Sequence, residues 1–325
     1  MTKYEVLTIL IKEKEYISGE IISKKLGISR AAVNTAVKAL KNDGYDIQAF
    51  TNKGYKLMNY PDKLNIGELM AFIDGERIAN VICLEDIDST NEEVKRLAAK
   101  GAEAGLAVIS NHQSKGKGRK GRGFVSPFDK GIYLSYLLKP ETVPENISEI
   151  TAWTAVAMCK AISNICQIKP DIKWINDLLV ENRKICGILT EMSVEAESMR
   201  VQYIVIGIGI NANHVIEDFP EELKESAGSI FLKTGEIVNR AKLAAEMIKE
   251  LDQLVLDWPK NKEEYISYYR KYCDTIGSDI YYFTGDDKVE ARAIGIDENF
   301  GLIVKLHDGE EKVLSSGEVS VRKIK

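Results

Sequence analysis

The chain has 325 residues, of which 45% are hydrophobic and 29% charged, and its formal net charge is −5 at pH 7. Such a composition is typical of a globular protein with room for two or three domains, and the net acidity argues against a protein coated by nucleic acid. No signal-peptide pattern opens the chain and no apolar run approaches the length of a membrane span, so we expect a cytoplasmic protein with no membrane association.

Cysteine and histidine usage gives little support to a metal centre. The five cysteines are scattered without a paired C-x-x-C spacing, and the three histidines lie far apart in the sequence. We therefore expect neither a disulfide framework nor a metal held by protein ligands.

The first sixty residues predict a winged helix-turn-helix. Apolar residues at helical spacing indicate helices over residues 3–14, 18–26 and 30–43, with Ser29 as the N-cap of the third. A short glycine turn separates the second helix from the third, and residues 47–57 have the pattern of a β-hairpin wing.

This N-terminal region is a candidate DNA-binding domain. Its lysines and arginines outnumber its carboxylates by ten to six, whereas the rest of the chain is acidic. The alternative is a small helical domain that only packs or dimerises. The side chains expected to meet base edges and phosphates are Ser29, Arg30, Ala31, Asn34, Thr35 and Lys38 around the third helix and Lys53 on the wing.

The central region predicts a mixed β-sheet backed by helices, the α+β class. A polar, proline-containing link at residues 59–63 precedes a short helix over residues 64–73. Residues rich in Ile, Val and Tyr predict strands at 106–110, 132–138, 173–180, 185–192 and 201–208. Helical periodicity predicts helices at 92–100, 148–165 and 239–258.

Short alternating runs characterise the last part of the chain. They predict strands at 280–283, 289–296, 302–306 and 312–314, which would form a small antiparallel barrel. The expected domains are therefore residues 1–60, 64–272 and 273–325.

A basic, glycine-spaced segment, Gly116-Lys117-Gly118-Arg119-Lys120-Gly121-Arg122, follows Gln113 in the central region. Its glycines allow close approach to a ligand, and its exposed amides and cations suit an anion. Taken alone, such a segment is more often a solvated, flexible loop than an anion-binding one.

A second segment, Lys173-Trp174-Ile175-Asn176-Asp177, is followed by Arg183-Lys184 and by Gly187. It reads as a polar pair within apolar strands, next to a tight turn that carries a lysine. An ordinary hairpin with a surface lysine is the alternative.

Together the two segments resemble the glycine-arginine loop and the K-W-P-N-D motif of biotin–protein ligases. Asp88-Ser89-Thr90-Asn91 upstream and residues 206–211 downstream stand in the order of that family, and the resemblance covers nearly the whole chain. The N-terminal layout is similar to the DNA-binding domain of the bifunctional biotin repressors. The resemblance implies a class II synthetase-like central domain and, with residues 316–322 as closing strand, an SH3-like C-terminal barrel.

The resemblance also implies a bifunctional biotin–[acetyl-CoA-carboxylase] ligase and biotin-dependent transcriptional repressor. The implied catalytic residues are Lys184, Arg119, Lys117 and Asp177. The implied contacts with biotin and the adenylate are Ser89, Thr90, Asn91, Gln113, Gly116, Lys117, Gly118, Arg119, Lys184, Gly187, Gly209 and Asn211. Asp177 could orient or deprotonate the acceptor lysine, or could hold its loop. Ser89 and Glu92 could also form a capping box at a helix start.

The expected ligands are ATP with Mg²⁺ and biotin, which serves as substrate and as precursor of the corepressor biotinyl-5′-AMP. The expected partners are a biotin carboxyl carrier domain, operator DNA and, with adenylate bound, a second copy of the chain. Two alternatives stay open, a lipoate-type ligase and a non-catalytic ligand-sensing repressor. Three residues depart from the family pattern: Lys117 replaces arginine, Ile175 replaces proline and Phe124 replaces a frequent tryptophan.

Overall fold

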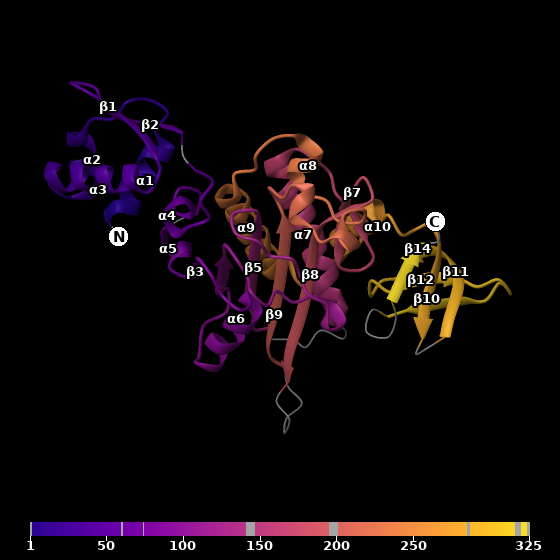
Figure 1. Ribbon diagram of the computed structural model, residues 1–325. Helices are drawn as coiled ribbons and strands as arrows, with labels where there is room; N and C mark the ends of the chain where they lie inside the picture. The colour runs from indigo at the N-terminus through magenta and orange to yellow at the C-terminus, as the bar shows by residue number, and fades with distance from the viewer. Residues whose placement is uncertain are drawn as a thin grey trace.

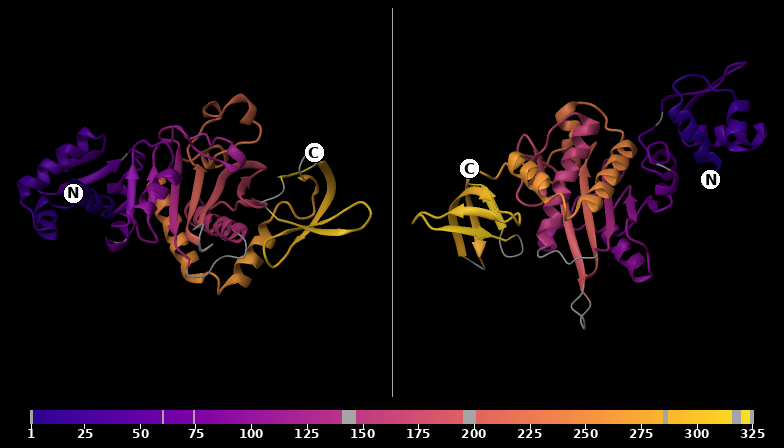
Figure 2. Two further views of the ribbon diagram at one scale, coloured as in Figure 1. Left: turned by 90° about the horizontal axis from the view of Figure 1, so that it is seen from below. Right: turned by 180° about the vertical axis from the view of Figure 1, so that it is seen from behind.

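Three units follow one another along the molecule (Figure 1). The computed structural model describes residues 2–59, 61–73, 75–140, 147–194, 201–284, 287–315 and 320–323. The N-terminal helices and hairpin lie at one end, the large sheet with its helices lies in the middle, and a smaller sheet lies at the other end, as two further views agree (Figure 2). Within the described ranges, no helix combines the length and apolar character that crossing a membrane requires.

The N-terminal unit is a helix-turn-helix followed by a hairpin, as predicted. Its elements are α1 (Thr2–Lys12), α2 (Gly19–Leu26), α3 (Arg30–Asn42), β1 (Asp46–Phe50) and β2 (Gly54–Asn59). Serine side chains cap the second and third helices: Ser18 Oγ accepts from Ile21 N at 3.2 Å and Ser29 Oγ accepts from Ala32 N at 3.1 Å. The unit has its own apolar core, which includes Val33, Val37 and Leu40.

A buried carboxyl group joins this unit to the middle of the chain. Tyr45 Oη donates to Glu68 Oε1 at 2.8 Å, and Asn65 Nδ2 donates to the same tyrosine oxygen at 3.2 Å. Glu68 lies in α4 (Ile66–Leu69), which is shorter than the predicted helix over 64–73 because Asn65 caps it and turns follow Leu69. Burial raises the pKa of Glu68 to about 7.

We expect a Glu68→Gln variant to gain stability relative to the wild type as the pH rises from about 5 to about 8. The folded protein keeps a proton on Glu68 up to about pH 7, whereas the unfolded chain releases it near pH 4.5. The free energy of unfolding of the wild type therefore falls as the pH rises through that window. Glutamine retains the acceptor for Tyr45 and does not titrate.

Urea unfolding of both proteins at the two pH values tests this expectation. The difference in free energy of unfolding should grow by up to about 3 kcal/mol between them. A difference that stays constant with pH would contradict a raised pKa at Glu68.

The central unit is built on a mixed seven-stranded sheet in the order β3-β4-β5-β9-β8-β7-β6, with β3 and β4 parallel and the other neighbours antiparallel. Its strands are β3 (Val81–Leu84), β4 (Ala107–Ser110), β5 (Gly131–Leu138), β6 (Asp171–Lys173), β7 (Asp177–Val180), β8 (Arg183–Val194) and β9 (Val201–Asn211). Its helices are α5 (Gly75–Ile78), α6 (Thr90–Ala99), α7 (Ile147–Cys166), α8 (Ile230–Thr234), α9 (Arg240–Asp257) and α10 (Lys262–Tyr272), with short 3-10 turns at Arg119–Gly121, Ile216–Asp218 and Glu221–Leu223.

One predicted strand is wrong. The single strand predicted over residues 173–180 is interrupted: β6 ends at Lys173, the chain reverses through Trp174, Ile175 and Asn176, and β7 begins at Asp177 and pairs antiparallel with β6. The Trp174–Ile175 peptide bond in this turn is cis. The prediction also missed β3 and α10, and it found the remaining strands of this sheet to within a few residues.

Strand alternation separates the two faces of the central sheet. On β5, Leu134 and Tyr136 join the large core formed with α7 and α9, while Leu137 joins a smaller cluster with Val94 of α6. The helix α6 therefore covers part of the face opposite α7 and α9. Ser135, which alternates with Leu134 and Tyr136, belongs to the face of α6.

The C-terminal unit is a five-stranded antiparallel sheet in the order β13-β12-β11-β10-β14. Its strands are β10 (Asp279–Thr284), β11 (Asp287–Ile296), β12 (Leu302–Lys305), β13 (Glu311–Leu314) and β14 (Ser320–Lys323). In the described residues the four-residue strands β13 and β14 are opposite edges that do not pair, so the sheet is open and closure of the predicted barrel is not seen. Residues 316–319 of the predicted closing strand lie outside the described residues.

Candidate active site

Glycines form the floor of a slot on the α6 face of the central sheet. Gly187 of β8 pairs with Gly209 of β9, and Gly207 points to the same face two residues earlier. A Cβ atom on Gly207 would lie 2.2 Å from Asn91 Oδ1, and one on Gly209 would lie 2.4 Å from the Phe124 ring. A side chain at either glycine would therefore displace Asn91 or Phe124.

The start of α6 supplies a polar wall. Gln113 Oε1 accepts from Thr90 N at 2.9 Å and from Thr90 Oγ1 at 3.0 Å. Asn91 Nδ2 donates to Glu191 Oε2 at 2.7 Å, while Asn91 Oδ1 accepts from Ser135 Oγ. These bonds fix the orientation of both amide side chains. The possible capping box at this helix is not formed, because Ser89 makes no side-chain N-cap bond.

The basic loop, residues 116–122, closes on itself beside this wall. Gly118 N donates to Arg122 O at 2.7 Å, and Phe124 N donates to Gly116 O at 2.9 Å. A Cβ on Gly116 would lie 2.4 Å from the carbonyl oxygen of Phe124, so this close approach requires glycine. Lys117 Nζ lies 2.6 Å from Glu92 Oε1, which ties the loop to α6.

The turn between β6 and β7 contacts the basic loop. Arg119 Nη1 donates to Asn176 Oδ1 at 3.0 Å, and Lys184 Nζ forms an ion pair with Asp177 Oδ1 at 2.7 Å. Burial lowers the pKa of the Arg119 guanidinium, and Asp177 acts in the opposite direction. Arg119 and Lys184 are therefore both held at this turn, and the Asp177 carboxylate interacts electrostatically with each of them.

The slot opens beside a second pocket. The two share Gly118, Arg119, Phe124, Asn176 and Lys184. The slot is further lined by apolar strand residues and the polar wall, whereas the second pocket extends toward Lys120, Arg122, Lys173, Asn182 and Phe219. Both cations lie where the pockets meet, so a carboxylate in one and a phosphate in the other would face the same charges.

Comparison with known proteins identifies the family. The "Bifunctional ligase/repressor BirA" of Bacillus spizizenii is 33% identical over 93% of both chains, and that of Escherichia coli is 30% identical over 97% of this chain and 96% of its own. The chain belongs to the bifunctional biotin–protein ligase/repressor family. A model of the "Biotin/lipoate A/B protein ligase family" matches residues 83–211, an "HTH domain" matches 2–56 and a "Biotin protein ligase C terminal domain" matches 280–322.

Solved structures agree with this membership of the biotin–protein ligase family. The "Biotin protein ligase from Aquifex aeolicus in complex with biotin and ATP" has a TM-score of 0.66 and 28% identity, and it covers 75% of this chain and 99% of its own. The apo structure of the same ligase gives a TM-score of 0.62 with 26% identity.

Ten of the twelve residues predicted to bind biotin or the adenylate line the slot, and two do not. These two are Gly116 and Asn211. Asn211 Nδ2 instead donates to the carbonyl oxygens of Gly228 at 2.9 Å and Lys184 at 3.3 Å, so this side chain fixes the backbone of two neighbouring segments. Asn211 also lines the second pocket. The slot residues that the prediction missed include Asn176 and Leu189. Strand alternation from Gly187 could have found Leu189.

The residues predicted to contact DNA lie away from the slot, on the outer surface of the N-terminal unit. Ser29, Arg30, Ala31, Asn34, Thr35 and Lys38 are all exposed around α3, and Lys53 is exposed on the wing. Lys53 Nζ lies 5.7 Å from the centre of the Phe50 ring and 5.9 Å from that of Tyr16. In this family member α3 thus presents an exposed face with four polar or charged side chains, Arg30, Asn34, Thr35 and Lys38.

Proposed function

We propose that the chain is an ATP-dependent biotin–[biotin carboxyl carrier protein] ligase that also represses transcription. The observation that carries the ligase proposal is the meeting of the slot and the second pocket at Arg119 and Lys184. A glycine-floored slot with fixed amides suits the flat ureido ring and apolar chain of biotin, and the adjoining pocket with further cations suits ATP.

In the first step a carboxylate oxygen of biotin attacks the α-phosphorus of ATP. The new P–O bond forms as the bond to pyrophosphate breaks, giving biotinyl-5′-AMP. Negative charges crowd together in this transition state, so fixed cations should accelerate the step. Lys184 and Arg119 fill this role because Asp177 and Asn176 hold them at the junction of the pockets.

In the second step the ε-amine of an acceptor lysine attacks the carbonyl carbon of the adenylate. An amide C–N bond forms, the bond between the carbonyl carbon and the phosphate oxygen breaks to release AMP, and the amine loses a proton to water. We assign to Asp177 mainly the positioning of Lys184, because their charged atoms are 2.7 Å apart. Lys117 is held by Glu92 and would reach the phosphate after exchanging that partner.

Magnesium would enter with ATP. In the part of the chain that the structure describes, no three histidine, cysteine, aspartate or glutamate side chains gather into a possible metal site. Mg²⁺ commonly binds through substrate phosphates and water with few protein carboxylates. We therefore propose that triphosphate oxygens supply most of its ligands and that it neutralises part of their charge.

The repressor proposal rests on the exposed polar face of α3 and on the wing. We propose that α3 enters the major groove of an operator and that two copies of the chain, joined when biotinyl-5′-AMP is bound, read two half-sites. The acceptor would be a biotin carboxyl carrier domain. The proposed units are residues 1–60 for DNA binding, 64–272 for catalysis and 273–325 for an SH3-like domain that supports it.

We expect Arg30→Ala and Lys38→Ala each to weaken operator binding by roughly tenfold, because each removes a contact to a base or phosphate of about 1–3 kcal/mol. Fluorescence anisotropy with a labelled operator fragment and biotinyl-5′-AMP would measure the effect. Lys305→Ala is the matched control, because Lys305 is also exposed but lies on the C-terminal sheet. Equal losses in all three variants would count against α3 as the reading helix.

The ligase proposal is tested by transfer of labelled biotin to a carrier domain, with lipoate in parallel. Transfer of biotin and not of lipoate supports the proposal. Transfer of lipoate would make the chain a lipoate-type ligase. Binding of biotin and operator without transfer would make it a sensor.

A further inference from the structure

The turn that presents Asn176 and Asp177 to the active site is anchored from behind by the C-terminal part of the chain. Trp174 N donates to Thr275 Oγ1 at 3.0 Å, and Trp174 Nε1 donates to the carbonyl oxygen of Phe300 at 2.8 Å. Both hydrogen bonds are buried, and they join residues 101 and 126 positions apart. They are therefore tertiary contacts that the turn cannot supply for itself.

The anchoring segment is itself well fixed. Asp274 N donates to Ile172 O at 2.9 Å, so the chain between α10 and β10 runs beside β6. Thr275 is 2% exposed and Phe300 is fully buried. The apolar core of the central unit continues into Ile280, Leu302 and other residues of the C-terminal sheet. Movement of the anchor relative to the turn is thus resisted by close packing.

The other side of the same turn holds the catalytic groups. The Asn176 side chain accepts from Arg119 and donates to Ile188 O at 2.9 Å, while Asp177 pairs with Lys184. A further buried hydrogen bond, from Tyr269 Oη to Ile175 O at 3.3 Å, fixes Ile175, which lies between Trp174 and Asn176. Each residue of the turn is consequently held, and only Ile175 separates Trp174, which contacts Thr275, from Asn176, which contacts Arg119.

We propose that the Thr275 hydroxyl and the Phe300 carbonyl are positioning groups for the adenylation step, acting through Trp174 on Asn176 and Asp177 and so on Arg119 and Lys184. This inference rests on the proposed ligase function. Neither Thr275 nor Phe300 lines the slot or the second pocket. The physical basis is that catalysis by fixed charges depends on their placement, and a displacement of about 1 Å can lower a rate by roughly 100-fold.

A pair of substitutions at one position separates positioning from general stability. Thr275→Val keeps the shape of the side chain and removes the acceptor for Trp174 N, whereas Thr275→Ser keeps the hydroxyl and removes only a methyl group. Thr154→Val is the matched control, because Thr154 is a fully buried threonine of α7 whose hydroxyl donates to Ile150 O and does not contact the turn.

The assay is pyrophosphate release by the full chain with biotin and MgATP, together with melting temperature and biotin affinity. We expect Thr275→Val to lower kcat at least roughly tenfold with biotin affinity within about twofold of the wild type. Thr275→Ser should restore kcat to within about threefold. Thr154→Val should lower the melting temperature and leave kcat close to the wild-type value.

Three results would overturn the proposal while leaving the ligase function intact. These are a Thr275→Val protein with wild-type kcat, a Thr275→Ser protein as impaired as Thr275→Val, and a Thr154→Val protein with the same loss of kcat. A wild-type chain that releases no pyrophosphate would instead overturn the proposed function, and this inference with it.

Discussion

Replacement of Lys184 by alanine should lower the rate of adenylate formation by about 1000-fold. The ammonium group lies at the junction of the slot and the second pocket, where the attacking carboxylate and the α-phosphate would meet. Its loss removes one cation and also leaves Asp177 without the partner that now lies 2.7 Å away. The unpaired carboxylate would then repel the substrates.

Pyrophosphate release at saturating ATP and biotin measures this effect, and calorimetry should still detect biotin binding in the slot. Lys233→Ala is the matched control, because Lys233 pairs with Glu181 of the same β7–β8 hairpin but does not line either pocket. A Lys184→Ala protein that keeps more than about a tenth of the wild-type rate would remove Lys184 from the proposed chemistry.

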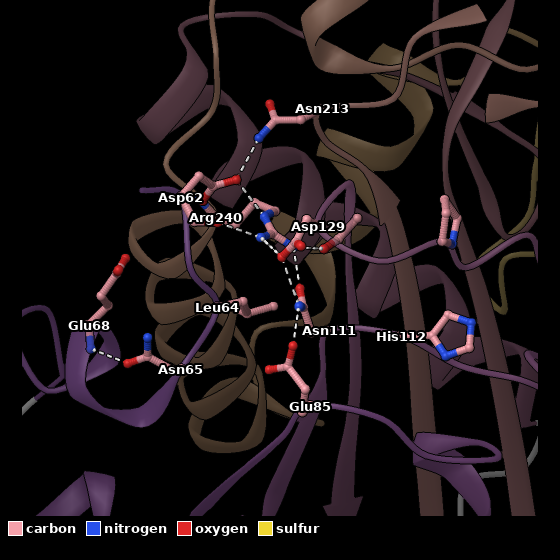
Figure 3. Close-up of polar contacts among 12 residues, drawn as sticks. Asp62, Leu64, Asn65, Glu68, Glu85, Asn111, His112, Asp129, Asn213 and Arg240 are labelled. Atoms are coloured by element: carbon pink, nitrogen blue, oxygen red, sulfur yellow. Dashed lines mark hydrogen bonds and ion pairs between the residues drawn. The ribbon is translucent and has the colours of Figure 1, made fainter. Parts of the chain in front are cut away.

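Replacement of Arg240 by leucine should lower the free energy of unfolding by about 3–5 kcal/mol. This arginine, at the start of α9, is completely buried. Its guanidinium bonds Asp62 in the link between the first two units, and it also bonds Asn111 at 2.7 Å (Figure 3). Leucine fills part of the volume, but it leaves the Asp62 carboxylate, 19% exposed, without its cation.

Chemical denaturation of the two proteins near neutral pH gives the comparison. Arg292→Leu supplies the control, because Arg292 pairs with Asp279 on the surface, where both side chains are more than half exposed. An exposed pair of this kind contributes about 1 kcal/mol or less. If Arg240→Leu destabilises the chain no more than Arg292→Leu does, the buried network around Asp62 is not an important source of stability.

The sequence predicted most accurately the helices, strands and site residues that depend on a few consecutive residues. Ser18 and Ser29 cap α2 and α3, and these residues marked both helix starts in advance. Strands β5, β8 and β9 also follow from their apolar patterns. For the site, the motifs located the basic loop and Lys184, because these residues are consecutive or nearly so in the sequence.

What the sequence did not predict depends on distant partners. The single strand expected over residues 173–180 breaks where Thr275 and Phe300 hold Trp174, and no local pattern records that contact. The short strand β3 is stabilised by pairing with β4, which begins more than twenty residues later in the sequence. The helical pattern over residues 239–258 did not predict the burial of Arg240, because its partners, among them Asp62 and Asn111, lie far away in the sequence.

The glycine floor of the slot limits how the binding preference of this protein can change. The floor consists of backbone at Gly187, Gly207 and Gly209. Because glycine is the smallest residue, any substitution at these positions can only narrow the slot. A wider slot for bulkier acids must therefore come from the side chains around the floor, such as Thr90, Gln113, Phe124 or Leu189. Selection or design for a new substrate would consequently find useful variants at these walls and not at the three glycines.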